Sequence, residues 1–145
     1  MPSELKVIIY GAKNLPIMEK SRNTTDAYCE VYFGKNQYKT QTIYNNLEPR
    51  WDQSFEFDNI DDEELQENVL RILVIDEDVI SRDDLIGSVY IDLSQLLIRD
   101  KDQKIMGWFP IYDINKGLRG TLNVEVKLNF IRDENIAKSI QSNMV

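Results

Sequence analysis

Residues 73 to 87 read Leu73-Val74-Ile75-Asp76-Glu77-Asp78-Val79-Ile80-Ser81-Arg82-Asp83-Asp84-Leu85-Ile86-Gly87. Two apolar runs predict two strands, and five acidic residues lie in the nine positions between the runs. Asp76 and Asp78 are two positions apart, so their side chains share one face if strand geometry continues into the loop. Repulsion between such carboxylates favours a divalent cation that prefers oxygen ligands. The alternative is an acidic turn that only faces water.

The spacing of this loop excludes an EF-hand. An EF-hand needs an acid or amide at positions 1, 3 and 5, glycine at position 6 and glutamate at position 12. Counted from Asp76, those positions hold Asp76, Asp78, Ile80, Ser81 and Gly87, so three of the five requirements fail. Any cation bound by this loop must therefore be shared with a distant part of the chain.

The composition indicates one globular domain with an acidic surface. The 145 residues are 42% hydrophobic, and 17 basic against 25 acidic residues give a net charge of −8. A chain this acidic is repelled from nucleic acid, and also from anionic lipid unless a bound cation reverses the local charge. The sequence contains no histidine and no Gly-x-Ser-x-Gly motif, which excludes most hydrolase triads. We therefore expect a binding protein without enzymatic activity or nucleic-acid partners.

The chain carries no sequence signal for membrane insertion or secretion. No apolar run reaches the length of about 18 residues that a membrane-spanning helix needs. The chain opens directly on a strand pattern, without the apolar core of a signal peptide. Its single cysteine, Cys29, alternates with strand residues, so we expect it in the core rather than in a disulfide. These features predict a cytoplasmic protein that is recruited to membranes.

Alternating apolar and polar residues predict eight strands separated by turn signals. The expected strands cover residues 5–10, 27–33, 38–43, 51–57, 69–75, 85–93, 108–112 and 122–130. One helical turn is expected within residues 58–67 and a short helix over residues 94–99. Eight strands with little helix predict an all-β, antiparallel sandwich or barrel over residues 1–131. Residues 132–145 lose the alternation, so we expect a polar tail or the start of a linker.

Antiparallel order brings distant loops together. If successive strands alternate in direction, the first, third and fifth connections, residues 11–25, 44–50 and 76–84, emerge at the same end of the sandwich. Five carboxylates from the first and fifth connections should then converge, namely Glu19, Asp26, Asp76, Asp78 and Asp84. Oxygen ligands without histidine or thiolate suit calcium, which accepts six to eight of them, better than the tight octahedron of magnesium.

Residues 3 to 130 resemble a C2 domain, the calcium- and phospholipid-binding β-sandwich. The matching pieces are Leu5 to Ile9, Asn14-Leu15-Pro16 with Asp26-Ala27-Tyr28, Leu47 to Phe57, and Val74 to Asp78 with Asp84 to Gly87. A chain that opens on Leu5 and closes on Gly120 to Val124 is similar to the circularly permuted, type II arrangement of this family. Met1-Pro2 and Trp108 to Asp113 resemble amino-terminal C2 domains of large phosphoproteins of vesicle traffic.

The resemblance implies roles for particular residues. Asp26, Asp76, Asp78 and Asp84 fall on four of the five acidic positions that hold calcium in the family. Glu19 falls on the fifth position, where aspartate is usual, and its longer side chain could weaken one site. Ser81 matches a position that helps to hold a third ion. The resemblance therefore implies two or three calcium ions.

Charge near the loops suggests how metal would change lipid binding. Seven acidic and three basic residues leave a charge of −4, which two calcium ions cancel and three reverse. The loaded loops would then accept anionic phospholipid, with contacts from Lys20 and Arg82. Val79 and Ile80 could enter the bilayer beside the ions, or they could pack on Ile17 or Met18 of the first loop.

Two further possibilities remain open at this point. The first is a C2-like scaffold that binds protein partners without calcium, which the presence of Glu19 in place of aspartate allows. The second is a basic patch for phosphoinositides on the side of the sandwich, made of Lys35, Lys39 and Arg50. A catalytic domain could also follow residue 145 in a longer parent protein.

Overall fold

Apolar residues at alternate positions become the buried face of the strands. The computed structural model describes residues 3–97 and 103–130. The strands are β1 (Ser3–Lys13), β2 (Ala27–Phe33), β3 (Asn36–Lys39), β4 (Arg50–Ile60), β5 (Val69–Asp76), β6 (Asp84–Asp92), β7 (Gln103–Asp113) and β8 (Gly117–Phe130). One short helix, α1 (Asp62–Glu67), follows β4, and a 3₁₀ turn, η1 (Ser94–Leu97), follows β6. The expected all-β fold with little helix is confirmed.

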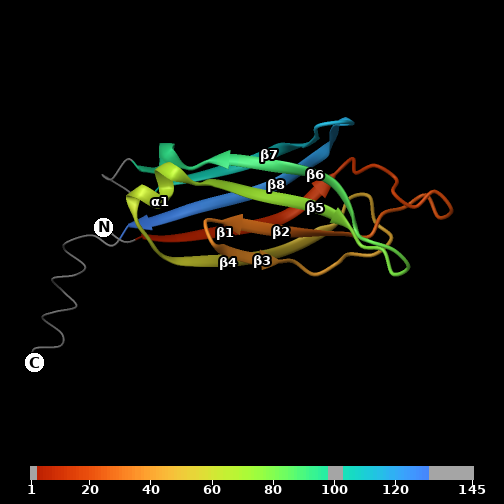
Figure 1. The fold of residues 1–145 in the computed structure, drawn as a ribbon, viewed down its shortest axis with the longest axis horizontal. Coiled ribbons are helices and arrows are strands. Elements are labelled where there is room, and N and C mark those ends of the chain that lie inside the picture. Colours follow the sequence, from red (N-terminus) through yellow and green to blue (C-terminus); the bar gives the residue numbers. More distant parts are fainter. Residues whose placement is uncertain (1–2, 98–102, 131–145) are drawn as a thin grey trace, which may run out of the picture.

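The strands form two antiparallel layers (Figure 1). Their order is β3-β2-β5-β6-β7-β8-β1-β4, and β6 meets β7 at a single pair, Ser88 with Tyr112, where the first layer passes into the second. On the other side, the Tyr38 ring of β3 stacks on Phe55 of β4 at 5.3 Å and meets Phe57 edge-on at 5.0 Å. The predicted sandwich of eight antiparallel strands is confirmed.

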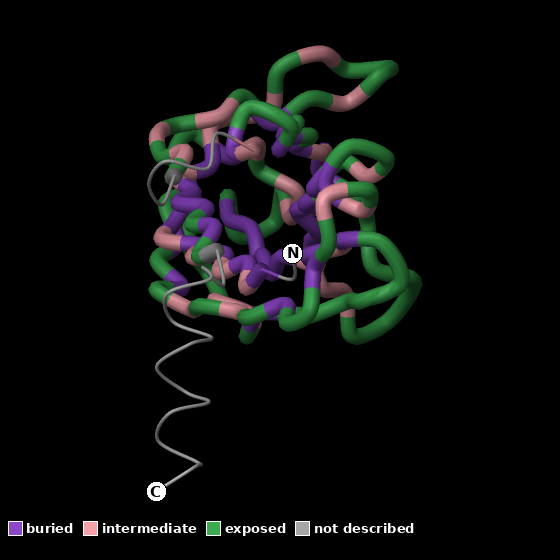
Figure 2. The backbone as a smooth tube through the Cα atoms, turned by 90° about the vertical axis from the view of Figure 1, so that its left-hand side faces the viewer, coloured by how far each residue is buried: buried purple, intermediate pink, exposed green. Residues whose placement is uncertain are grey.

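The core lies between the two layers, as the buried segments in the interior of Figure 2 show. Leu5, Val7 and Ile9 of β1 are fully buried, as are Ile72 and Val74 of β5 in the facing layer. Cys29 is also fully buried, and burial raises the pKa of its thiol. Cys29 is therefore a core residue, as the sequence predicts.

Several predicted elements differ in length from the observed ones. The strand expected over residues 38–43 ends at Lys39, because the Thr40 hydroxyl accepts a hydrogen bond of 2.8 Å from the Cys29 backbone N–H in place of a backbone carbonyl. The strands expected to start at residues 108 and 122 start at Gln103 and Gly117, since they pair with each other as one long hairpin. Of the helix expected over 94–99, residues 94–97 form the 3₁₀ turn, and residues 98–99 lie outside the described residues.

Both ends of the sandwich are visible in Figure 1. The connections 14–26, 40–49 and 77–83 emerge at one end, and the β7–β8 hairpin turns at the same end. α1 lies at the opposite end. The convergence of the odd-numbered connections is therefore confirmed.

Among the described residues, no helix is long and apolar enough to cross a membrane. The tail expected over 132–145 lies outside the described residues.

Candidate metal centre at the loop end

The first and fifth connections are joined by direct hydrogen bonds. The Asp26 backbone N–H donates to Asp76 Oδ1 at 2.9 Å, and the Glu77 N–H donates to the Asp26 carbonyl at 2.8 Å. Asp76 is also paired with Ala27 of β2 on one side and with Asp84 of β6 on the other. Asp26 immediately precedes β2, Asp76 ends β5 and Asp84 begins β6, so the three acids lie at the same end of three adjacent strands.

A pocket of about 440 Å³ lies at this end of the sandwich. Its lining includes all five predicted carboxylates and the predicted hydroxyl: Glu19, Asp26, Asp76, Asp78, Asp84 and Ser81. The predicted convergence of these side chains is confirmed, and their binding of metal stays a prediction. The donor set consists of hard oxygen ligands, which suits calcium.

The ionised form of Asp76 is destabilised by its surroundings in this pocket. Asp76 is 7% exposed, and burial is the main cause that raises the pKa of its carboxyl. The carboxylates of Asp26, Asp84 and Asp78 raise it further, while the hydrogen bond from the Asp26 N–H opposes them. A bound cation would remove this penalty, because an opposite charge favours the ionised form.

The side chain of Arg22 provides a positive charge beside two of the pocket carboxylates. Its guanidinium makes a two-pronged contact with Glu19, at 3.2 Å from Nε to Oε1 and 2.6 Å from Nη2 to Oε2. Arg22 Nη2 also lies 3.9 Å from Asp26 Oδ2. In the sequence, Arg22 stands out only as one of the charges near the loops. Arg22 lies three residues after Glu19 and four residues before Asp26, and this short spacing is the sequence feature that could have indicated the two ion pairs.

Asp78 is engaged with its own loop. Asp78 Oδ1 accepts hydrogen bonds from the backbone N–H groups of Ile80 at 2.9 Å and Ser81 at 3.2 Å, and Oδ2 accepts one from the Ser81 hydroxyl at 2.8 Å. These bonds lower the pKa of the Asp78 carboxyl. Asp78 and Ser81 thus line the pocket and also fix the turn, so metal would have to share or replace the hydroxyl contact.

Asp83 has a structural role that the sequence did not reveal. Asp83 Oδ2 accepts a hydrogen bond of 2.6 Å from the Tyr28 hydroxyl, and Oδ1 accepts one of 2.9 Å from the Asp78 N–H. Both contacts lower the pKa of the Asp83 carboxyl, and the hydroxyl bond helps to raise that of Tyr28, behind burial. Asp83 does not line the pocket and instead ties the 77–83 loop to β2.

The third connection supplies contacts rather than predicted ligands. The Asn45 backbone N–H donates to Asp26 Oδ1 at 2.7 Å, and the Tyr44 hydroxyl donates to Glu77 Oε2 at 2.5 Å. Both contacts orient acids at the rim of the pocket. Asn45 has a positive φ of 55°, a conformation that asparagine tolerates.

The loop carboxylates are close without being tightly clustered. Among the described residues, the one group of three carboxylates with oxygens within 4.8 Å of each other is Glu4, Glu56 and Asp58, on β1 and β4. That trio lies towards the opposite end of the sandwich, since Ser3 pairs with Ile60 there. The loop-end carboxylates are therefore spread around their pocket rather than gathered at one point.

Val79 and Ile80 stand out from the loop end. Their exposed fractions are 90% and 94%, so the alternative in which they pack on Ile17 or Met18 is wrong. Lys20 is exposed in the 14–26 connection, and Arg82 is exposed in the same 77–83 connection as Val79 and Ile80. All four residues predicted to contact a membrane are thus accessible, and the contact itself stays a prediction.

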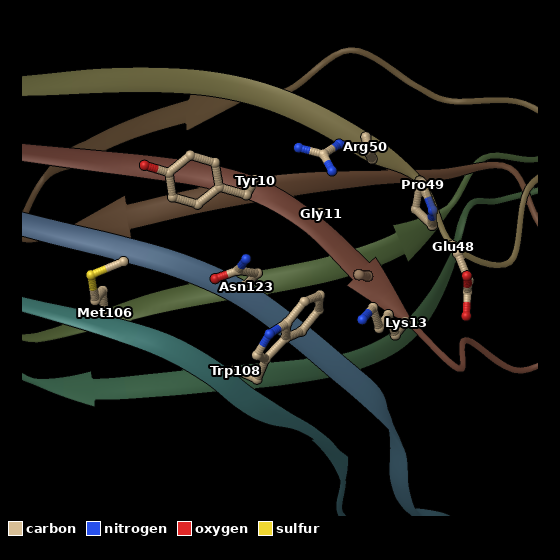
Figure 3. Close-up of a pocket in the computed structure, with 10 residues that line it drawn as sticks. Tyr10, Gly11, Lys13, Glu48, Pro49, Arg50, Met106, Trp108 and Asn123 are labelled. Carbon is tan, nitrogen blue, oxygen red and sulfur yellow. The ribbon is translucent and has the colours of Figure 1, made fainter.

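The three residues of the suggested basic patch lie in different surroundings. Lys35 borders a hollow beside α1, and Lys39 Nζ lies 4.2 Å from the centre of the Tyr28 ring. Arg50 borders a groove of about 420 Å³ on the β1-β4-β7-β8 layer, where Lys13 covers the Trp108 ring at 4.6 Å (Figure 3). The three cations lie in three separate surroundings and form no single basic patch.

Comparison with known proteins places the chain in a family. The sequence profile of the C2 domain matches residues 3–111. The chain is 43% identical over 135 residues to "C2 domain-containing protein 5" of Mus musculus and Homo sapiens, a match that covers 93% of the chain. It spans 13% and 14% of the length of those two proteins. It is also 33% identical over 135 residues to "Multiple C2 domain and transmembrane region protein 6" of Arabidopsis thaliana, covering 90% of the chain and 13% of that protein.

Solved structures agree on the fold. The first C2 domain of plant Extended Synaptotagmin 1 matches with a TM-score of 0.72 at 20% identity, over 90% of this chain and 97% of that one. The calcium-bound pair of C2 domains of Extended-Synaptotagmin 2 matches with a TM-score of 0.69 at 21% identity, over 88% and 46%. With the family profile and the 43% identical relatives, they establish that this chain belongs to the C2 domain family.

Proposed function

We propose that the chain binds two or three calcium ions at its loop end and, when loaded, binds anionic phospholipid membranes. The proposed metal ligands are Glu19, Asp26, Asp76, Asp78 and Asp84, with help from Ser81. The observation that carries the proposal is the shared pocket, in which a buried Asp76 is surrounded by other carboxylates. A calcium-bound relative with the same fold supports it.

Electrostatics connects the metal to the membrane. Without metal, the acidic pocket repels a negatively charged bilayer. With metal, the loops become neutral or positive, and lipid phosphates can complete the coordination of the ions. Calcium and lipid should therefore increase each other's affinity, with a coupling free energy of about 1 to 3 kcal/mol. Lys20 and Arg82 would contact phosphates, and Val79 and Ile80 would enter the bilayer.

Arg22 fits this proposal as an exchangeable counter-charge. It is held by Glu19 and by a longer contact to Asp26, two of the proposed ligands. Its side chain is 55% exposed, so it can turn into solvent when metal binds, or towards a lipid phosphate. We infer a binding role without catalysis, which the absence of histidine from the sequence supports. We also infer that this binding takes place at the cytoplasmic face of membranes.

The alternative is a calcium-independent scaffold for protein partners. The specific observation in its favour is also Arg22, which neutralises part of the pocket without any ion. The groove in Figure 3, with Trp108 partly exposed, is a surface that such a scaffold could use. The scaffold predicts that calcium changes neither stability nor membrane binding.

One experiment separates the two functions. Calcium is titrated into the protein by calorimetry, without vesicles and with vesicles that contain phosphatidylserine. We expect heat of binding in both cases and tighter binding with vesicles. Asp76→Asn with Asp78→Asn should abolish calcium-dependent sedimentation with vesicles without unfolding the domain. If calcium produces no heat and no change in melting temperature, the scaffold is favoured and the calcium proposal is rejected.

A further inference from the structure

Four large apolar side chains stand out by their exposure. Val79 and Ile80 are 90% and 94% exposed, and Ile114 and Leu118 are 85% and 71% exposed. The next most exposed large apolar residue described is Tyr90, at 64%. Val79 and Ile80 lie in the 77–83 loop, whereas Ile114 lies in the turn between β7 and β8 and Leu118 is the second residue of β8. Grouped exposure of this kind is uncommon without a binding partner.

The β7–β8 turn is held in place by its own hydrogen bonds. Asp113 Oδ2 accepts bonds from the N–H groups of Asn115 at 3.0 Å and Lys116 at 2.9 Å. Gly117 has a φ of 77°, which suits glycine, and it pairs with Asp113 to close the hairpin. A defined turn therefore presents Ile114 and Leu118 to solvent.

The hairpin also contacts the loops of the metal centre. Arg119 Nη2 donates to the Met18 sulfur at 3.4 Å, and Met18 lines the acidic pocket. At Gly120, an added Cβ would lie 2.5 Å from the Lys13 carbonyl and 2.8 Å from that of Asn14. The base of the hairpin thus packs closely on the start of the 14–26 connection. In Figure 1 the hairpin turns at the same end as the loops, to one side of them.

Charge distinguishes the hairpin from the pocket beside it. Lys116 and Arg119 against Asp113 leave a charge of +1 over residues 113–119, whereas the neighbouring pocket is acidic. A cationic turn with two exposed aliphatic side chains suits an anionic bilayer, since apolar atoms enter the acyl region and lysine meets phosphate. No metal is needed for this contact.

We propose that the β7–β8 hairpin is a second membrane-contacting element, and that Ile114 and Leu118 enter the same anionic bilayer as Val79 and Ile80. This inference rests on the proposed function. Because the hairpin lies to one side of the loops, contact at both places tilts the long axis of the sandwich towards the β7–β8 side. Contact at two separated places also fixes the orientation of the domain on the membrane.

The test compares Ile114→Ser/Leu118→Ser with Val79→Ser/Ile80→Ser and with a control, Val69→Ser/Tyr90→Ser. Val69, at the start of β5 and far from the loops, is 47% exposed, and Tyr90, on the outer face of β6, is 64% exposed. We expect the hairpin variant to bind calcium normally in solution and to lose about tenfold or more in partitioning onto calcium-loaded phosphatidylserine vesicles. The control should bind like the parent.

A second measurement locates the hairpin directly. The chain has one cysteine, Cys29, and it is fully buried, so a nitroxide can be attached selectively to Ile114→Cys. On vesicles with calcium, the nitroxide should become accessible to oxygen and protected from a polar quencher. Unchanged partitioning of the hairpin variant, or a nitroxide that stays in water, overturns the inference while the parent's calcium-dependent binding upholds the function. A parent that does not bind calcium-loaded vesicles overturns both.

Discussion

Asp26 and Asp76 hold each other through a hydrogen bond of 2.9 Å, from the backbone N–H of the first to the carboxylate of the second. The bond fixes a buried carboxylate with its charge beside those of Asp26, Asp84 and Asp78. The proposed metal site is therefore organised in the metal-free protein, at a cost in repulsion between its carboxylates. Removing one of these charges should change stability and metal binding in opposite directions.

Asp76→Asn should separate metal binding from folding. The asparagine side-chain oxygen can still accept the Asp26 N–H, but it removes a buried charge that its neighbours oppose. We expect a metal-free melting temperature equal to or above that of the parent, with loss of the rise caused by calcium. For the parent, calcium at 100 times its dissociation constant should stabilise the fold by about 2.7 kcal/mol.

Asp58→Asn is the matched control for this prediction. Asp58 belongs to the trio with Glu4 and Glu56, the three carboxylates described within 4.8 Å of each other. Melting curves with and without calcium should match those of the parent. If Asp58→Asn abolishes the calcium effect and Asp76→Asn does not, metal binds at the trio and the loop-end assignment is wrong.

The pH dependence of stability should carry the signature of Asp76. Its pKa is raised above the ordinary value of 3.8, so the folded state holds this proton more tightly than the unfolded state. Its contribution therefore becomes less favourable as pH rises above 3.8. In calcium-free buffer, the advantage of Asp76→Asn over the parent should appear above that pH and vanish below it. Asp78 and Asp83, whose pKa values are lowered, act in the opposite direction in both proteins. A difference independent of pH would contradict this origin.

Some of this site could be read from the sequence and some could not. Asp26, Asp76 and Asp84 each adjoin a strand with clear alternation, so antiparallel order was enough to place them together. The bond between Tyr28 and Asp83 depends on the path of the loop and on side-chain rotamers, which no sequence period encodes. The two strands of the β7–β8 hairpin were predicted but their full length was not, because residues 103–107 and 117–121 take strand geometry from pairing with each other rather than from alternation.

Tyr28→Phe should test whether the 77–83 loop is held from outside the pocket. The change removes the hydroxyl that donates to Asp83 at 2.6 Å and leaves every proposed ligand intact. A hydrogen bond to a charged group contributes about 1.5 to 3 kcal/mol, so denaturant unfolding should show a loss towards the lower end. Amide hydrogen exchange in residues 77–84 should become faster, and calcium affinity should fall modestly. Tyr90→Phe, at an exposed position, is the control. Unchanged exchange in the loop would mean that other contacts hold it.

Arg22→Gln should increase calcium affinity, because the arginine occupies oxygens of Glu19 and approaches Asp26. The ion pair is exposed and screened by solvent, so its loss should change the free energy of unfolding little. Release of Glu19 and removal of one positive charge both favour a cation, and we expect a gain of several-fold in calorimetric titration without vesicles. Lys20→Gln is the matched control, since it removes the same charge from an exposed neighbour in the same loop. Competition for ligands predicts a larger gain for Arg22→Gln than for Lys20→Gln, whereas net charge alone predicts equal gains. A weaker calcium affinity in Arg22→Gln would show instead that the arginine positions Glu19 for the metal.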